Sequence, residues 1–293
     1  MSISTTIMPR PAATSDIDVA DTISPADFKQ DYIHKNRPLL LRGMTAEWPA
    51  MKKWSFEFFA SLNLEKAVFL EQNNVMQGDA RFAEMSYRDY FQQLASPVTG
   101  ADASVGYLSV FKIFRSFPEL KPDVDFSILA RHKIKNTVAG WIGPAGTVTG
   151  FHVDWGDNML AQICGRKEVR LVSPAQSHLM YPSNRFDQGT TSSRIDADHY
   201  DQQRFPLFRQ ARQRRVELQP GEMLFIPRGW WHYVRSLDKS ISVSSIGYDV
   251  RGIVVDLLAH RVKQVLHDCG LYSVPCTCHF VRDGKRIRRT VAN

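Results

Sequence analysis

From Trp141 onward, the chain is built from short apolar runs separated by Gly, Pro, Asn and Asp. Short strands at regular intervals with turn residues between them are typical of an all-β sandwich or jelly roll. Two marked breaks, Gly-Pro-Ala-Gly at 143–146 and Pro220-Gly221, indicate turns within this region. We therefore predict a mainly β fold, a double-stranded β-helix or jelly roll, with its core over about residues 105–249.

The N-terminal part mixes helical and strand patterns, so we expect α/β additions before the β core. Ser24-Pro25-Ala26-Asp27 combines an N-cap, a proline at the first helical position and an acidic residue, which predicts a helix through Tyr32. Residues 1–20 contain few bulky apolar side chains and are expected to form a disordered leader, so the main folded domain is predicted over 21–249. Further predicted elements are strands at 38–41 and 67–71, a helix from Ser55, and a helix over 87–94 capped by Ser86.

After Val250 the spacing of apolar residues becomes helical again, and Gly270 is suited to end the helix. Two interpretations stay open: the helix packs on the β domain, or it pairs with a second subunit in a homodimer. Residues 250–293 are predicted to form this helix and a basic tail, and the polar stretch 183–215 an insert between strands. The apolar positions are Ile253, Val254, Leu257, Leu258, Val262, Val265 and Leu266.

Composition narrows the class of protein. A hydrophobic content of 43% and an aromatic content of 11% fit a soluble globular protein. No apolar run approaches the ~20 residues that span a bilayer, and residues 1–20 lack the pattern of a signal peptide, so we expect no membrane partner and a cytoplasmic location, or a nuclear one in a eukaryote. The net charge of +7 gathers in 209–215 and 282–289, which we interpret as a solvated edge and a loose tail rather than dedicated nucleic-acid binding.

Three of the four cysteines lie near the C-terminus, close in sequence to His267 and His279. A Cys-x-Cys pair with nearby histidines can hold structural zinc. The spacing lacks paired Cys-x-x-Cys motifs, and reduced thiols are the default in the cytoplasm, so metal-free cysteines are favoured and zinc stays open. The four residues are Cys164, Cys269, Cys276 and Cys278.

The strongest candidate for chemistry is His152-Val-Asp154 together with His232. Residues i and i+2 of a strand point to the same face, so His152 and Asp154 can bind one metal ion, with His232 supplied by a distant strand. Two histidines and one carboxylate form the facial triad of non-heme Fe(II) oxygenases, which leaves open positions for other ligands. Each motif alone is weak, but the apolar runs beside them, such as 225–227, place the polar ligands inside a barrel.

Lys167 alternates with Val169 and Leu171, so a strand that faces the core would point this lysine inward. A buried lysine needs an anionic partner or a lowered pKa. Fe(II) oxygenases often use 2-oxoglutarate, and the far carboxylate of this cosubstrate would suit Lys167. The opposite parity would bury two charges, Glu168 and Arg170, and is disfavoured. On 241–245 a serine face that includes Ser244 is expected either to line the same pocket or to form a neutral, hydrogen-bonded face.

A set of motifs across residues 37–248 makes the chain similar to the Jumonji-C, cupin-like 2-oxoglutarate oxygenases. Within them it most resembles the small hydroxylase branch and its arginyl hydroxylase. Together the motifs are far more specific than any one of them. They are Arg37-Pro-Leu-Leu-Leu-Arg-Gly43, Trp48-Pro-Ala-Met-Lys-Lys-Trp54, Tyr107-Leu108, Phe117-Pro-Glu-Leu-Lys121, Trp141-Ile-Gly-Pro-Ala-Gly-Thr147, His152-Val-Asp154, Gly165-Arg-Lys167, Ser173-Pro174 and Pro220-Gly-Glu-Met-Leu-Phe-Ile-Pro227.

The resemblance implies Fe(II), 2-oxoglutarate and O2 as cofactor and cosubstrates, with ascorbate as reductant in vitro. It implies that the triad binds iron and that Lys167 binds the cosubstrate carboxylate with help from the Thr149 hydroxyl. The further residues implied to contact the cosubstrate are Asn158 and Tyr107, and we add Ser244 from the serine face.

For the substrate, the resemblance implies hydroxylation of an unactivated C–H bond in an amino-acid side chain, with arginine in a protein or peptide favoured. Glu71 falls where the arginyl hydroxylase holds a guanidinium, and Trp141 and Trp155 are further expected substrate contacts. Many demethylases of the superfamily carry Glu at the position of Asp154, which favours hydroxylation. A free amino acid or metabolite substrate, N-methyl-lysine demethylation and a non-catalytic metal-binding cupin stay open. The chain departs from the family at Trp155-Gly156-Asp157 and Ile246-Gly247, both near the expected substrate mouth.

Overall fold

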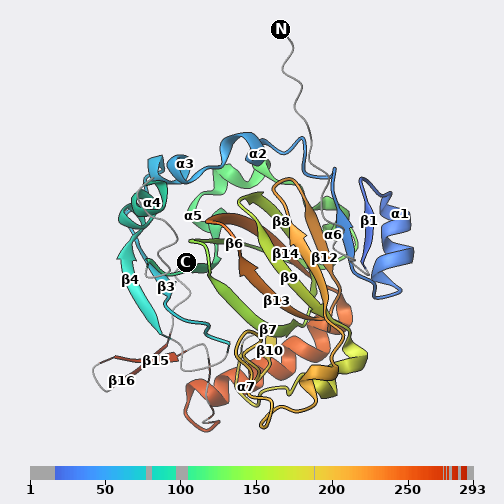
Figure 1. Ribbon diagram of the computed structural model, residues 1–293. Helices are drawn as coiled ribbons and strands as arrows, with labels where there is room; N and C mark the ends of the chain where they lie inside the picture. The colour runs from blue at the N-terminus through green and yellow to red at the C-terminus, as the bar shows by residue number, and fades with distance from the viewer. Residues whose placement is uncertain are drawn as a thin grey trace.

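The computed structural model describes residues 17–76, 81–96, 105–187, 189–272, 274, 276, 279–282 and 285–288. The predicted leader at 1–16 and Cys278 lie outside these residues. Two large sheets form the centre of the molecule, and helices from the N-terminal part lie over one of them (Figure 1).

The larger sheet has seven strands and is mainly antiparallel. Its strand order is β1 (Asp18–Ala20), β2 (Leu39–Leu41), β12 (Met223–Ile226), β8 (Asp157–Cys164), β14 (Ser240–Tyr248), β6 (Lys135–Gly143) and β5 (Leu108–Phe111). The smaller sheet has five antiparallel strands. Its order is β10 (Thr190–Ser192), β7 (Val148–Asp154), β13 (Trp231–Ser236), β9 (Lys167–Val172) and β11 (Arg214–Leu218).

The two sheets face each other across an apolar interior. Leu160 and Leu224 from the larger sheet pack with Val169, Leu171 and Val216 from the smaller one. Because strand side chains alternate between two faces, each sheet has an inner face in this interior and an outer face that something else must cover. The arrangement confirms the predicted jelly roll with helical additions.

The N-terminal elements cover the outer face of the larger sheet. Met159 and Phe225 on that face join the aromatic cluster of the helices, which includes Phe59, Tyr87 and Phe91. Ser24, Ser55 and Ser86 cap their helices as predicted, each accepting a backbone hydrogen bond three residues later. The elements are α1 (Pro25–Asp27), η1 (Phe28–Ile33), α2 (Pro49–Lys53), α3 (Phe56–Ser61), β3 (Ala67–Glu71), β4 (Phe82–Ser86), α4 (Tyr87–Ala95), α5 (Ile113–Ser116), η3 (Pro118–Asp123) and α6 (Ser127–Ala130).

The insert at 183–215, predicted as a polar stretch between strands, lies between β9 and β11 and also contains buried apolar residues. The insert includes η5 (Phe208–Gln210). Together with η4 (Pro174–Leu179), it covers the outer face of the smaller sheet. Its buried Ile195, Phe205 and Phe208 pack against Phe151 and Tyr233 of that face. The insert also supplies β10, and its last two residues already belong to β11. Few apolar residues, spaced without a strand or helix period, were enough to form this second small core.

The N-terminal boundary also differs from the prediction. Residues 18–20 form β1, which pairs in parallel with β2 at the edge of the larger sheet. Ile17 is buried with Leu40 in the interior between the sheets, so order begins within the predicted leader. A three-residue strand is too short to show an alternating pattern, and tertiary pairing alone defines it.

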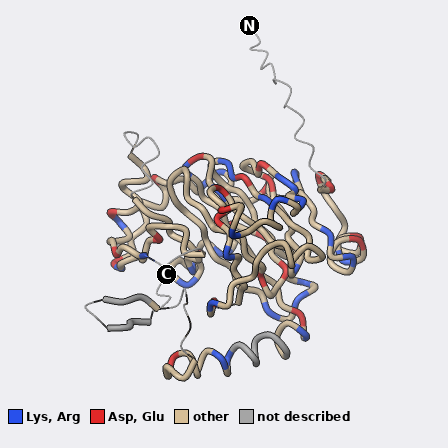
Figure 2. Tube along the Cα trace, turned by 60° about the horizontal axis from the view of Figure 1, so that its bottom comes forward, with Lys and Arg blue, Asp and Glu red and all other residues tan. Residues whose placement is uncertain are grey.

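At the C-terminus, η6 (Gly252–Leu257) and α7 (Leu258–Asp268) continue from β14 as one helical segment, and Gly270 follows with a positive φ of 78°. Figures 1 and 2 place α7 at the edge of the molecule. Val254, Val262 and Val265 are more than half exposed, so the described part of this helix leaves an apolar face uncovered. The homodimer through this helix stays a prediction. The basic tail contains a hairpin, β15 (His279–Arg282) with β16 (Lys285–Arg288), rather than only a loose segment.

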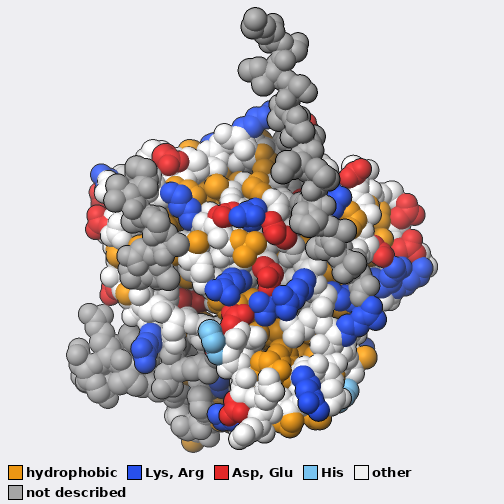
Figure 3. Space-filling model, in the orientation of Figure 1, with side chains coloured by type: hydrophobic (Ala, Val, Ile, Leu, Met, Phe, Trp, Pro, Cys, Tyr) orange, Lys and Arg blue, Asp and Glu red, His pale blue; other side chains and the backbone are white. Residues whose placement is uncertain are grey.

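Basic and acidic side chains are interspersed on the face seen in Figure 3. Arg166 pairs with Glu217 and Asp238, and Arg170 pairs with Glu168 and Asp198. Carboxylates therefore partly balance these two arginines, one just before β9 and one on it. Among the described residues, none of the helices has both the length and the apolar composition required to cross a membrane.

Candidate metal and cosubstrate site

Three side chains with metal-binding groups lie close together on the inner face of the smaller sheet. His152 and Asp154 lie two residues apart on β7, and His232 lies directly across from His152 on the neighbouring strand β13. Nε2 of His152 is 3.8 Å from Oδ1 of Asp154, and Nε2 of His232 is 3.5 Å from Oδ2. All three residues are buried, and their ligand atoms lie within 4.8 Å of one another. The structure therefore brings the predicted triad together.

Backbone carbonyls orient both histidine rings. Nδ1 of His152 is 2.8 Å from the Gly150 carbonyl oxygen, and Nδ1 of His232 is 3.1 Å from that of Trp230. A carbonyl only accepts hydrogen bonds, so each Nδ1 carries the proton and each Nε2 presents a lone pair toward the centre. Burial and the nearby His152 lower the pKa of His232 to about 4, which keeps its ring neutral, as a metal ligand must be.

A β-bulge places Thr149 on the same face as the triad. The register runs from His232 opposite His152 to Val234 opposite Thr149, so β7 uses one more residue than β13 over this span. Simple alternation would turn Thr149 away from His152, and the extra residue reverses its direction. Gly150 lies in the bulge, where an added Cβ would be 2.8 Å from the Asn74 side chain.

Lys167 faces the interior from β9, opposite Ser236 of β13, in the predicted parity. It is 1% exposed, and its Nζ donates to the Tyr107 hydroxyl at 3.2 Å, with the ammonium 5.4 Å from the centre of the Tyr107 ring. No carboxylate of the described residues pairs with this amine. Burial lowers the pKa of Lys167 to about 7, because no nearby anion compensates for the loss of water around the charged amine.

Tyr107 links Lys167 to Thr149 and Glu71. Burial and then the Glu71 charge hold the pKa of Tyr107 well above its usual range, and the nearby Thr149 side chain acts to lower it. Glu71 and Tyr107 exchange two backbone hydrogen bonds of 2.9 Å, which join β3 to the segment before β5. The Glu71 carboxylate is buried and accepts a hydrogen bond from the Ser109 hydroxyl. Lys167, Tyr107 and Glu71 thus lie close together in one polar part of the interior.

Two more predicted residues lie on the inner face of the larger sheet. Asn158 donates from Nδ2 to Asp154 Oδ2 at 2.9 Å, and its Oδ1 is buried without a hydrogen-bond partner. Ser244 accepts a hydrogen bond of 2.8 Å from Nε1 of Trp141, whose ring centre is 6.3 Å from that of Tyr107. Trp141, expected at the substrate, thus lies beside the residues predicted to contact the cosubstrate.

The donor set fits a divalent metal of the first transition series. Two neutral imidazole nitrogens and one carboxylate, all on one side of the centre, form a facial set that suits Fe(II). The hydrogen bonds to Nδ1 of each ring and from Asn158 to Asp154 supply the outer contacts that orient metal ligands. The unpartnered Asn158 Oδ1 is an acceptor available to a further group at this centre.

Comparison with known proteins agrees with this geometry. The family model described as a cupin-like domain matches residues 25–245. Lysine-specific demethylase 8 of Xenopus tropicalis is 36% identical over 225 residues, which cover 74% of this chain and 49% of the relative. Jumonji C domain-containing protein 5 of Drosophila melanogaster is 30% identical over 249 residues, or 82% of this chain and 62% of the relative.

The chain belongs to the cupin-like Jumonji-C family. A further member, human HSPB1-associated protein 1, is 27% identical over 245 residues, 75% of this chain and 50% of the relative. This cupin-like Jumonji-C chain spans about half to three fifths of the length of these curated relatives.

The two departures from the family pattern pack against each other. A Cβ added at Gly156 would be 2.7 Å from the Gly247 carbonyl oxygen and 2.7 Å from Cγ2 of Ile246. A Cβ added at Gly247 would be 2.5 Å from Cγ of Lys133. Lys133 is buried there and forms an ion pair with Asp157, which also accepts a backbone hydrogen bond of 2.7 Å from Arg228. The changes form one unit at the end of β7 and β14, next to Asp154 and the half-buried Trp155.

Gly156→Ala is expected to destabilise this Jumonji-C domain, because the new methyl would meet a backbone carbonyl that cannot move freely. We expect a loss of about 1–3 kcal/mol in the free energy of unfolding, which lowers Tm by several degrees. Thermal unfolding measures the effect. Gly140→Ala is the matched control, since its Cβ would meet Phe111 at an ordinary 3.6 Å. Equal Tm values for the two variants would contradict the close approach.

Tyr248 is a site residue that the sequence interpretation missed. It lies at the end of β14, four residues after Ser244, so both side chains point to the same face of the strand. Strand alternation could therefore have predicted that Tyr248 faces the site. Burial, and then the charge of Asp154, raise the pKa of Tyr248 to about 12, which places its neutral phenol near the triad. Asn74 was also missed. Its Oδ1 accepts a hydrogen bond of 3.1 Å from the Gly150 backbone in the bulge, and no motif marks it.

Proposed function

We propose that this Jumonji-C protein is an Fe(II)- and 2-oxoglutarate-dependent oxygenase that hydroxylates an amino-acid side chain. The observation that carries the proposal is the buried Lys167 amine, which has no anionic partner among the described residues and shares an interior with the His152, Asp154 and His232 triad. When bound, iron would supply O2 activation coupled to oxidation of 2-oxoglutarate to succinate and CO2. The chain itself holds the metal, orients the cosubstrate and excludes water.

The polar group around Lys167 fits the carboxylate at the far end of 2-oxoglutarate. The Lys167 ammonium and the hydroxyls of Tyr107 and Thr149 would donate charge-assisted and neutral hydrogen bonds to its two oxygens. Trp141 and Ser244 would close the pocket at the larger sheet. Asn158, which already holds Asp154, would act next to the metal.

An arginyl side chain is the proposed substrate. The Glu71 carboxylate is buried and close enough to Tyr107 for its charge to raise the pKa of that phenol. A substrate guanidinium would pair with this carboxylate and direct its aliphatic chain toward the metal. The proposal also rests on the resemblance at Asp154 and Glu71 to the hydroxylase branch. Trp155 and Tyr248, at the end of β7 and β14, would form the mouth through which the peptide approaches.

The first test is turnover. Protein supplied with Fe(II), ascorbate and 2-oxoglutarate is incubated with arginine, lysine, asparagine and histidine peptides and with free amino acids. Succinate is followed by NMR and products by mass spectrometry. We expect succinate above the no-enzyme background and a mass gain of one oxygen atom on an arginine peptide. Metal binding with no succinate under any condition would favour a non-catalytic cupin instead, and oxygen gain on a free amino acid would move the proposal to a small-molecule hydroxylase.

Demethylation of N-methyl-lysine is the second candidate, because the Xenopus tropicalis relative described above is named a lysine-specific demethylase. Both reactions would consume 2-oxoglutarate, so succinate does not separate them. Formaldehyde release from methylated lysine peptides does, because demethylation expels the oxidised methyl carbon. We expect hydroxylation, so the peptide product should keep the added oxygen atom and formaldehyde should not exceed background.

The affinity for 2-oxoglutarate is expected to fall as pH rises above neutrality. Burial lowers the pKa of Lys167 to about 7, so the amine loses its charge above that pH in the ligand-free protein, whereas both carboxylates of the ligand stay ionised. Binding would then require proton uptake, with up to about tenfold weaker affinity for each pH unit above 7. Calorimetry between pH 6 and 9, in buffers of different ionisation enthalpy, measures both. Constant affinity across this range would contradict the assignment.

A further inference from the structure

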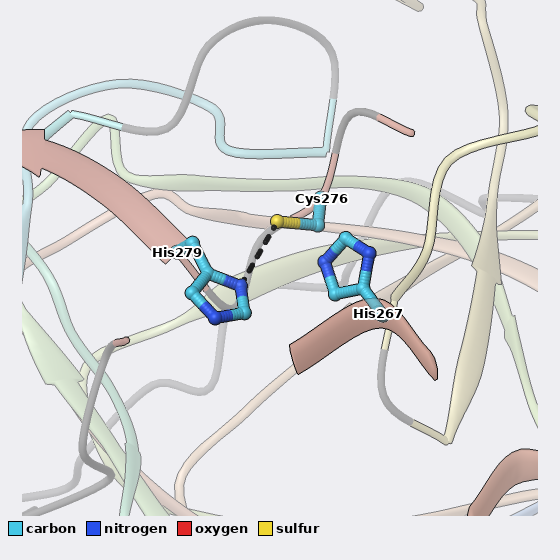
Figure 4. A group of neighbouring side chains, drawn as sticks. All are labelled: His267, Cys276 and His279. Atoms are coloured by element: carbon cyan, nitrogen blue, oxygen red, sulfur yellow. Dashed lines mark hydrogen bonds between the residues drawn. The ribbon is translucent and has the colours of Figure 1, made fainter. Parts of the chain in front are cut away.

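A second group of metal-binding side chains lies in the C-terminal part, outside the region that the cupin-like family model matches. His267 lies near the end of α7, Cys276 follows that helix, and His279 begins β15. Their ligand atoms lie within 4.8 Å of one another. Figure 4 shows the three side chains pointing toward a common centre from three separate segments, with the Cys276 Sγ and His279 Nδ1 3.6 Å apart.

Both histidines have the outer contacts of metal ligands. Nδ1 of His267 is 2.7 Å from the Tyr272 carbonyl oxygen, so this nitrogen carries the proton and Nε2 presents the lone pair. Nε2 of His279 is 3.5 Å from Oδ1 of Asp268, which leaves Nδ1 on the side of the Cys276 sulfur. A ring nitrogen that faces a carbonyl or carboxylate, while the other nitrogen faces a shared centre, is the usual arrangement around bound metal ions.

The donor types select the metal. Thiolate and imidazole are the ligand types that zinc takes in structural sites, and four-coordinate zinc would need a fourth donor beside these three. The site is partly shielded from solvent: the His267 side chain is fully buried, that of His279 is 8% exposed, and Cys276 is half-buried. Because sulfur is absent from the triad of His152, Asp154 and His232, the two sites differ in the metal that they favour.

The position of the cluster connects it to the candidate active site. Phe186 forms a bridge with Cys276, and its ring lies 4.8 Å from that of His267. A few residues later, β10 pairs with β7 so that Thr190 and Ser192 lie opposite the metal-binding residues of that strand. A metal ion here would fix the C-terminal segment against the insert that supports β7.

We propose that His267, Cys276 and His279 form a structural zinc site that fastens α7 and the β15–β16 hairpin to the insert beside β7. This assignment does not depend on the oxygenase reaction. It gives the two histidines and one cysteine of this segment a common role and makes the C-terminal part of the chain a metal-dependent extension of the jelly roll.

Cobalt spectroscopy on the full-length chain tests the site directly. After removal of metals with a chelator, Co²⁺ is added and the near-ultraviolet and visible spectrum is recorded. We expect a thiolate-to-cobalt charge-transfer band with the strong visible absorption of four-coordinate cobalt. The triad contains no sulfur and cannot give the charge-transfer band. Cys276→Ser should abolish the band, and Cys164→Ser, which removes a thiol on β8, should retain it.

Zinc content and stability provide a second measurement in case a variant folds poorly. In the His152→Ala/Asp154→Ala background, which lacks the first site, the protein is expected to retain a single zinc ion per chain. Chelation should lower its Tm, whereas adding His267→Ala should remove both the zinc and this sensitivity. His199→Ala, at a largely exposed histidine, serves as control. Absence of the cobalt band in the unsubstituted chain, its survival in Cys276→Ser, or zinc retained after His267→Ala would overturn the proposal.

Discussion

His152→Ala is expected to reduce Fe(II)-dependent succinate formation to background. The side chain supplies one of three protein ligands, and its Nε2 lies with the Asp154 carboxylate and Nε2 of His232 in a buried centre. Loss of an outer contact to a metal ligand already costs about 10- to 100-fold in metal affinity or activity. Removal of a ligand itself should therefore cost more than about 100-fold. Succinate formation by NMR and metal affinity by titration with Mn²⁺ give the two readouts.

The control must show that the loss comes from the metal and not from folding. His199→Ala removes a histidine whose side chain is 84% exposed and should leave both readouts unchanged. The Tm of metal-free His152→Ala should stay close to that of the metal-free unsubstituted chain, because the ring makes only one hydrogen bond, to the Gly150 carbonyl. Succinate formation by His152→Ala at more than a tenth of the normal rate would rule out this triad as the metal site.

Lys167→Ala is expected to weaken 2-oxoglutarate binding by roughly 30-fold to several thousand-fold. Truncation of one partner of a buried, hydrogen-bonded charge pair costs about 2–5 kcal/mol, and each 1.4 kcal/mol is a factor of ten in Kd. The ligand carboxylate would lose the cationic partner proposed for it, while Tyr107 and Thr149 would still offer hydroxyls. Calorimetry of the Mn²⁺-loaded protein under anaerobic conditions measures Kd without turnover.

Lys167→Met separates charge from packing. Methionine fills similar space without an ammonium, so it should bind 2-oxoglutarate as weakly as the alanine variant. Its free energy of unfolding in the absence of ligand should equal or exceed that of the unsubstituted chain, because the lysine is buried without an anion. Lys35→Ala, which removes an exposed lysine paired with Asp31, should leave Kd unchanged. Normal affinity in either Lys167 variant would refute the cosubstrate assignment.

Strand alternation explains which site residues could be predicted. His152 and Asp154 share a face because they are two residues apart, and Lys167 shares the interior with Val169 and Leu171 for the same reason. These features depend only on the period of a strand, which is local. Thr149 has the wrong parity for that face, and its predicted role came from the resemblance alone. The bulge that turns it inward exists because β13 and β7 pair with unequal numbers of residues, which alternation within one strand does not encode.

Long-range packing explains most of the differences in the fold. The insert at 183–215 looked polar, yet its few apolar residues found a partner surface in Phe151 and Tyr233 on the outer face of the smaller sheet. The short strand β1 is stable only as a neighbour of β2. In both cases the decisive contacts join segments that are far apart in the chain or too short to carry a periodic pattern. The local sequence pattern therefore does not predict these contacts.

By itself, the sequence determined the jelly roll, the capped N-terminal helices, the parity of the triad strand and the inward direction of Lys167, because each follows from local spacing and side-chain chemistry. Only the tertiary structure decided that His232 lies opposite His152 and that Lys167 donates to the Tyr107 hydroxyl. It also decided that Gly156 packs against Gly247, and Gly247 against Lys133, at the end of β7 and β14. It also brought His267, Cys276 and His279 to one centre. The physical reason is that the side chains that bind one metal ion must lie within a few ångströms of one another. The pairing of segments that are distant in the chain brings them that close.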